Sequence, residues 1–283
     1  MLGQREARWL VDQYYQIQDF RIQSANQVRQ SGEEEPNRVL SWMAESMRRL
    51  ESDIQKALGE FSDQYTIGQW MQSITGIGPV ISAGLLSHLD VRECKTAGHF
   101  WRFAGMDPTQ KWEKKQKRPW NAKLKCLCWK ASECFVKFQN HKNDFYGKLY
   151  VERKAYEIAR NESGGNADAA KAALEAKNYR AETDTRKAYE SGILPPAHIH
   201  ARAERWVSKL FLSHIHHAMW VDYYGTEPLK PYAFEKCPGD HRHFIDLPNW
   251  PFKSSGKSLR ELLVDEPTAL KEPNDASEAK PSD

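Results

Sequence analysis

Two closely spaced glycines followed by a proline constrain the fold of this chain more than any other sequence feature. Residues 74–86 read I-T-G-I-G-P-V-I-S-A-G-L-L, with apolar residues on both sides of the glycine pair. Gly76 and Gly78 can adopt backbone angles closed to other residues, and Pro79 suits the first position of a helix, where no N–H is required. The segment therefore predicts a helix, a tight turn and a second helix, the pattern called helix-hairpin-helix.

Helical periodicity continues over most of the chain. Apolar residues recur at helical spacing over 9–22 and 39–58, on either side of a break at 31–36, which predicts an antiparallel helical hairpin. Further helices are predicted over 145–160 and, as an exposed arm with few apolar residues, over 167–190. No segment alternates polar and apolar residues as a strand does. We therefore predict an all-α fold.

These elements divide the chain into three parts. Residues 1–65 are expected to form the N-terminal helical hairpin, and residues 66–252 a helix-hairpin-helix domain. That domain is predicted to end with a long amphipathic closing helix over 201–224 and an irregular strap over 225–252 that is rich in proline, aromatic residues and histidine. Residues 253–283 form the predicted acidic tail. Its end contains several prolines and lacks aromatic residues, so we expect disorder from about residue 265 onward.

The composition excludes several classes of protein. No apolar run reaches the roughly 18 residues that a membrane-spanning helix needs, and the first ten residues do not resemble a signal peptide. The five cysteines are irregularly spaced, which argues against a disulfide framework and for a reducing, cytoplasmic location. Cys126 and Cys128 are predicted to be buried small apolar residues, because two positions apart on a helix they point to different faces.

Charge is segregated along the chain. The net charge is only +3, yet residues 111–125 hold seven basic residues, one acidic residue and two tryptophans. Lysine and arginine neutralise phosphates, aromatic rings stack on bases, and free N–H groups at a helix start can hold a phosphate oxygen. Together these features predict nucleic-acid binding, the alternatives being a packing turn and a solvated charged loop. The predicted binding residues are Gly76, Ile77, Gly78, Lys111, Trp112, Lys114, Lys115, Lys117, Arg118, Trp120 and Lys123.

At three places the sequence resembles one known family. The turn segment is followed by A-G-M-D-P at 104–108 and by N-A-K-L-K-C-L at 121–127. This order is similar to the C-terminal domain of the bridge-RNA-guided insertion-sequence transposases, or DEDD recombinases. Their domain carries a helix-hairpin-helix, an A-G-L-x-P segment and a G-N-x-x-L-R-x-x-L helix; Lys125 stands here at the arginine position. The resemblance covers about residues 66–224 and implies DNA, with structured RNA as a further candidate, as the partner.

The chain also departs from that family in two ways. Family members begin with a metal-dependent RNase H-like domain, which residues 1–65 are too few and too helical to contain. Their C-terminal domain supplies a serine nucleophile before the G-N helix, whereas Thr109 is the only hydroxyl residue here between Pro108 and Asn121. We therefore expect a DNA-binding domain of transposase type without a recognisable acidic metal site or catalytic serine, and Thr109 is the single candidate nucleophile.

A histidine-rich region offers a candidate zinc site. His214 and His217 are three positions apart on the predicted closing helix, so they share one face. Cys237, His241 and His243 follow in the strap and could complete a tetrahedral set. The spacing matches no known finger, and the alternative is that these side chains cap helices, form hydrogen bonds or face solvent. No other cofactor is expected.

Three hypotheses for function follow. The first is DNA binding in transposition or recombination, or in a role derived from them, with a backbone phosphate held by the helix-hairpin-helix. The second is active recombination or cleavage through Thr109 or through a partner's nuclease domain. The third is a phage or plasmid interaction protein without nucleic-acid function. The amphipathic N-terminal helices further predict a homo-oligomer.

Overall fold

The computed structural model describes residues 2–30, 37–229 and 244–263. Eleven α-helices and no β-strand occur among these residues, so the predicted all-α fold is confirmed. None of the described helices is both long enough and apolar enough to cross a membrane.

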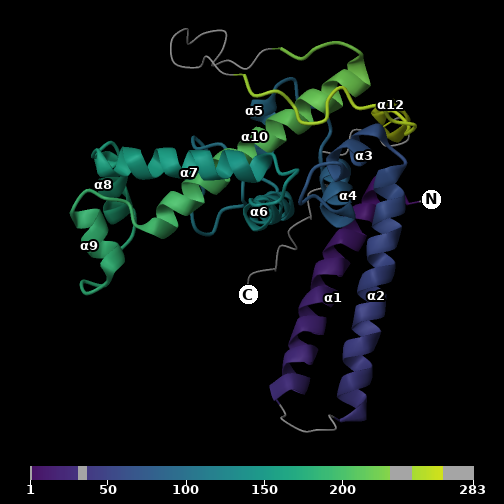
Figure 1. Cartoon of the computed structure of the whole chain (residues 1–283), viewed down its shortest axis with the longest axis horizontal. Helices are drawn as coiled ribbons and strands as arrows, with labels where there is room; N and C mark the ends of the chain where they lie inside the picture. Colours follow the sequence, from purple (N-terminus) through teal and green to yellow (C-terminus); the bar gives the residue numbers. More distant parts are fainter. Residues whose placement is uncertain (1, 31–36, 230–243, 264–283) are drawn as a thin grey trace, which may run out of the picture.

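The first two helices form the predicted hairpin. Helix α1 (Gln4–Gln30) and helix α2 (Arg38–Asp63) lie side by side and extend away from the rest of the molecule (Figure 1). The Asn37 side chain accepts a hydrogen bond of 2.9 Å from the Val39 N–H and so caps the start of α2. Near the base of the hairpin, Val11 and Leu58 belong to the main hydrophobic core. The hairpin therefore shares its core with the helices that follow, and the predicted boundary at residue 65 remains a prediction.

Helix α4 (Pro79–His88) lies at the centre of the fold. It follows helix α3 (Thr66–Gln72) after a turn, as the glycine pattern predicted, and it packs against α1, α2, α3 and α6. Every side chain from Val80 to Ser87 is buried. A Cβ atom at Gly84 would lie 2.6 Å from Leu127 Cδ2, so glycine permits the close approach of α4 and α6.

A long helix organises the second half of the chain. Helix α10 (Pro196–Tyr224) contacts helix α5 (Ala97–Phe103), helix α6 (Ala122–Lys137) and helix α7 (Tyr146–Glu162). It starts earlier than the predicted residue 201 because Pro196, which cannot continue a helix, is well suited to begin one.

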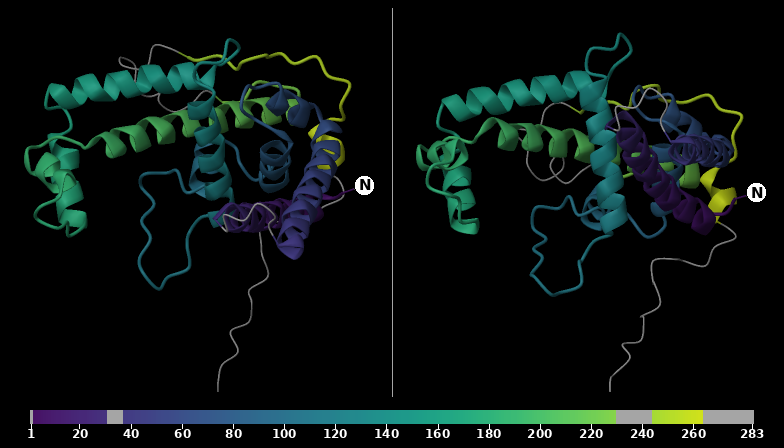
Figure 2. Two further views of the ribbon diagram at one scale, coloured as in Figure 1. Left: turned by 60° about the horizontal axis from the view of Figure 1, so that its bottom comes forward. Right: turned by 90° about the horizontal axis from the view of Figure 1, so that it is seen from below.

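The predicted arm over 167–190 is helical but not continuous. Helix α8 (Ala167–Ala176) and helix α9 (Asp184–Glu190) fold against each other at the far end of α7 and α10 (Figures 1 and 2). A small separate core forms there from Ala170, Tyr189, Leu194 and Ile199. A straight arm would expose these apolar residues, and the break lets them pack together.

The chain after α10 returns to the main core. Residues 244–258 are irregular, as expected for the strap, but helix α12 (Leu259–Leu263) packs into the main core. Its leucines are buried, and the Asp222 carboxylate accepts a hydrogen bond of 2.6 Å from the Leu259 N–H. The predicted domain boundary at residue 253 remains a prediction. The predicted disorder from about residue 265 onward lies outside the described residues.

The junction of α2 and α3 gives a stability prediction. A Cβ atom at Gly68 would lie 1.9 Å from the backbone oxygen of Ser62, which cannot move without shifting α2. Gly68→Ala should therefore lower the free energy of unfolding by about 2 kcal/mol, measured by urea denaturation. Gly59→Ala is the control, because its Cβ would make only an ordinary 3.5 Å contact with Pro79. Equal stability of the two variants would contradict this packing.

Candidate nucleic-acid interface

The turn between α3 and α4 confirms the predicted backbone angles at Gly76 and corrects them at Gly78, whose extended angles (φ -95°, ψ 177°) are open to any residue. Gly76 has a φ of +95°, which disfavours any side chain, and Gly78 is the extended N-cap of α4. A hydrogen bond of 3.0 Å from the Ile77 N–H to the Ile74 oxygen closes the turn. Within the described residues, the N–H groups of Gly78, Val80 and Ile81 have no hydrogen-bond partner. They are donors at a helix start, where an anion is favoured.

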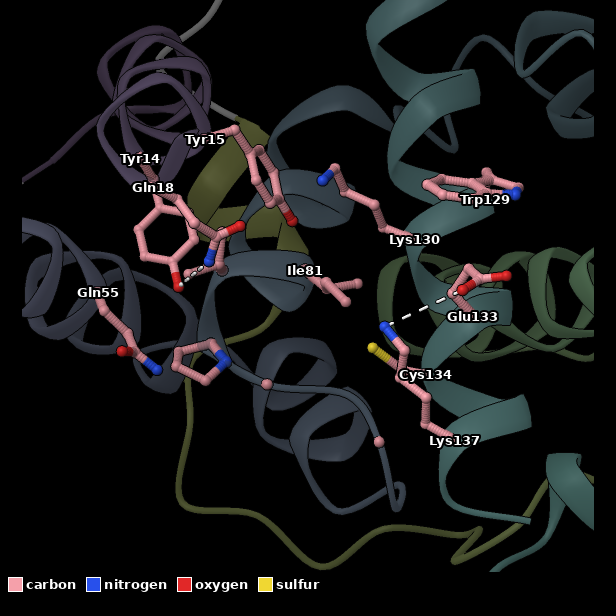
Figure 3. A pocket seen from close by; sticks show the side chains of 14 residues that line it. Tyr14, Tyr15, Gln18, Gln55, Ile81, Trp129, Lys130, Glu133, Cys134 and Lys137 are labelled. Atoms are coloured by element: carbon pink, nitrogen blue, oxygen red, sulfur yellow. Dashed lines mark hydrogen bonds and ion pairs between the residues drawn. The ribbon is translucent and has the colours of Figure 1, made fainter. Parts of the chain in front are cut away.

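A groove of about 500 Å³ opens beside this turn. One wall comes from α1 and the start of α4, including Tyr14 and Tyr15, and the other wall comes from α6 (Figure 3). Gly76 and Gly78 line the groove, and a Cβ atom at Gly78 would meet no atom within 4 Å. The free donors of the turn therefore border a hollow that a ligand can enter.

Helix α6 adds groove residues that the sequence prediction missed. Trp129 is 51% exposed, and the Lys130 ammonium lies 3.9 Å from the centre of the Tyr15 ring. Lys137 lies about two turns further along the same helix and also lines the groove. Cys126, predicted to be buried, is exposed on α6, whereas Cys128 is buried. The sequence signal for this face of α6 is a tryptophan that lies among lysines at helical spacing. It can be recognised only once the buried positions of α6 are known, because these place the tryptophan on the exposed side.

One groove residue carries the opposite charge. Glu133 lies between Trp129 and Lys137 on α6, and its carboxylate is 4.0 Å from the Lys137 ammonium (Figure 3). The groove therefore pairs cationic and aromatic side chains with a single acidic side chain from α6.

The predicted basic residues lie on a projecting loop. The chain from 111 to 119 is exposed throughout and stands out from the body between α5 and α6 (Figure 2). Trp112 donates a hydrogen bond of 2.7 Å to the Gln116 oxygen, and the Arg118 guanidinium lies 5.3 Å from the centre of its ring. The conformation of the loop around Trp112 is thus held by contacts between residues of the loop itself.

Trp120 and Lys123 lie at the base of this loop and make contacts within the protein. The Trp120 ring packs against Gly105, where a Cβ atom would lie 2.6 Å from the ring. The Lys125 ammonium lies 4.4 Å from the centre of the same Trp120 ring. Lys123 pairs with Asp12 of α1. These contacts attach the loop to the body, so of the two predicted tryptophans Trp112, which is 41% exposed, is the one that faces solvent.

The turn and the loop lie at opposite ends of α6. The loop leads into the first residue of α6, Ala122, whereas a Cβ atom at Gly76 would lie 3.4 Å from Cys134 near the end of that helix. At the rise of an α-helix, these positions are separated by about 18 Å. The predicted binding residues of the turn and those of the loop therefore do not line one common pocket. Helix α6 connects the two groups.

Thr109 has no activating neighbour in the contacts that hold it. Its hydroxyl donates to the Asp107 carboxylate at 2.7 Å, and its N–H donates to the same oxygen at 2.9 Å. These hydrogen bonds lower the pKa of Asp107, which makes that carboxylate a weak proton acceptor. The arrangement is a capped loop turn, and the nucleophile role of Thr109 remains a prediction.

The candidate zinc ligands are described only in part. Cys237, His241 and His243 lie outside the described residues. Burial lowers the pKa of His214 to about 4, and both of its ring nitrogens have partners, the Tyr146 hydroxyl at 2.7 Å and the Ile245 oxygen at 2.8 Å. His217 Nε2 lies 2.8 Å from the Glu227 carboxylate. A zinc ion would have to displace one of these partners of His214, and this site also remains a prediction.

Comparison with known proteins assigns the central segment. Residues 68–146, from α3 to the start of α7, match the model of the Transposase IS116/IS110/IS902 family. This segment is a transposase-family domain. It contains the glycine turn, the basic loop and α6, and it supports a transposase-type role in transposition. No curated protein and no solved structure matches the chain.

Proposed function

We propose that this chain is a DNA-binding protein of the transposase type and that its glycine turn holds a phosphate of the DNA backbone. The observation that carries the proposal is the groove beside the turn, where unpaired N–H groups face a cationic and aromatic wall inside the transposase-family segment. Such contacts position a protein on DNA without reading its sequence. The role in transposition follows from the family, and the mode of DNA contact is our inference.

In this proposal the two sides of the groove act together. The N–H groups of Val80 and Ile81 donate to a phosphate oxygen, and Lys130 and Lys137 supply positive charge from α6. Trp129, half exposed beside them, provides an aromatic face against a sugar or an unpaired base. The Tyr15 ring keeps Lys130 extended along the groove wall through a cation–π contact.

The basic loop contributes at long range. Its lysines are exposed and, within the described residues, Lys114, Lys115 and Lys117 make no ion pair. Such cations release counterions when they approach phosphates, which makes the affinity depend on salt. The loop therefore supplies electrostatic affinity at one end of α6, while the turn fixes position at the other.

Gly78→Asp separates the turn's proposed binding role from its role in folding. Aspartate is a favourable N-cap, and its carboxylate would accept hydrogen bonds from the free N–H groups of α4. We expect Tm to be unchanged or higher and the affinity for DNA to fall at least tenfold, because a carboxylate occupies the phosphate position. Fluorescence anisotropy against duplex, branched and single-stranded DNA and a structured RNA measures the affinity and identifies the preferred substrate.

Thr183→Asp is the matched control for that experiment. It adds the same charge at the N-cap of α9, where the Thr183 side chain already accepts a hydrogen bond from the Arg186 N–H. Its affinity for nucleic acid should equal that of the wild type. If Gly78→Asp binds as tightly as this control, the turn is not the phosphate site.

The loop has its own prediction. Replacing Lys114, Lys115 and Lys117 with Gln should reduce the slope of log K against log salt by up to about 3, since each phosphate contact contributes about 0.9. The control replaces Lys171, Lys177 and Lys187, which are exposed on or near the small helices α8 and α9, with Gln. Equal slopes for the two triple variants would remove the loop from the interface.

We also propose that the hairpin joins two copies of the chain. On α1, Trp9 and Phe20 are 62% and 60% exposed and eleven positions apart, hence on one face; on α2, Val39 and Trp42 are 61% and 66% exposed. Large exposed apolar side chains along both helices of the hairpin support an interaction surface there.

Trp42→Glu tests this surface. The variant should sediment as a monomer at concentrations where the wild type is a dimer, because a carboxylate would be desolvated at the contact. Trp112→Glu, the same change on the basic loop, should leave the association intact. A wild-type chain that stays monomeric at high micromolar concentration would refute the proposal.

A further inference from the structure

A cluster of three potential metal ligands lies where α6 crosses α10, outside the turn and the loop. Glu133 comes from α6, and His200 and Glu204 lie one turn apart on α10. One ligand atom from each side chain lies within 4.8 Å of the other two. Two carboxylates and an imidazole, drawn from two packed helices, thus converge on one small volume.

The cluster contains a buried oxygen that has no partner. The Glu204 side chain is only 8% exposed, and its Oε1 atom has no hydrogen-bond partner among the described residues. Burial, followed by the neighbouring Glu133 carboxyl group, raises the pKa of Glu204 to about 7. An unsatisfied buried carboxylate is costly, and a bound proton or a cation would remove that cost.

His200 is oriented by a further contact. Its Nδ1 atom lies 2.7 Å from the Tyr150 hydroxyl, while its Nε2 atom lies on the other side of the ring, 3.4 Å from Glu204 Oε2. When Nδ1 carries the proton and donates to the tyrosine oxygen, Nε2 presents its lone pair to the cluster. A second partner that fixes the tautomer in this way is the usual companion of a histidine metal ligand.

We propose that Glu133, His200 and Glu204 bind a divalent transition-metal ion, with zinc or manganese as the class that suits one nitrogen and two carboxylate oxygens. Three protein ligands leave one position open to water. The ion would neutralise the facing carboxylates and tie α6 to α10. This inference does not depend on DNA binding, because its ligands and its test concern the metal alone.

Zinc content tests the proposal. Wild-type chain dialysed against Zn²⁺ and then against buffer should retain zinc, and Glu204→Gln should lose about one equivalent of it. Glu152→Gln, the same change at an exposed position of α7, is the matched control and should retain the wild-type content. A difference between the two glutamine variants isolates this cluster from the predicted set that contains Cys237.

Melting temperatures give a second readout. A hundredfold excess of Zn²⁺ over Kd should raise Tm by about 5 °C in the wild type and not in Glu204→Gln. Tyr150→Phe, which removes the partner of His200, should weaken zinc binding roughly tenfold while preserving the stoichiometry. His200→Asn serves as the alternative ligand variant if Glu204→Gln does not fold. Equal zinc content and equal Tm shifts in the ligand variant and in Glu152→Gln would overturn the proposal, and a proton shared between the two carboxyl groups would then account for the cluster.

Discussion

The burial of α4 on every side is the constraint on which the rest of this structure depends. A helix without a polar face must be enclosed, and here α1, α2, α3 and α6 enclose it. Its two buried hydroxyl groups both donate hydrogen bonds to backbone oxygens. The Ser82 hydroxyl donates to the Gly68 oxygen at 3.1 Å, and the Ser87 hydroxyl donates to the Gly84 oxygen at 2.9 Å. Only the N-terminal end of α4 reaches the groove. The packing that hides the helix therefore also fixes the direction of the N–H groups at its start.

Much of the fold could be predicted from the sequence because helices are local. The hairpin, the turn between α3 and α4, and the long closing helix follow from apolar spacing and from the positions of glycine and proline. The failures required knowledge of distant contacts. The break between α8 and α9 depends on a small core that includes Leu194, which lies beyond both helices. The docking of α12 depends on Asp222 and on the main core.

The residues of the candidate interface also fall into those set by local sequence and those set by distant contacts. Gly76 and Gly78 were predictable because the turn's geometry is encoded within six residues. The α6 wall was not, since Trp129 and Lys130 become groove residues only when α1 and α4 lie opposite them. Trp120 and Lys123 show the converse case, in which residues that match the basic, aromatic pattern are used to attach the loop. The pattern of charge predicted an interface, and the tertiary packing selects which of its members face outward.

Helix α6 sets a fixed distance between the turn and the loop. These two elements are held about 18 Å apart by one continuous helix. Along one strand of a duplex, successive phosphates rise by about 3.4 Å, so this length corresponds to about five base pairs. Five base pairs are half a helical turn, after which the strand that faced the protein has passed to the far side. In the proposed mode of DNA binding, the turn and the loop would thus meet opposite strands of a duplex aligned with α6, and the length of this helix would fix the spacing of the two contacts.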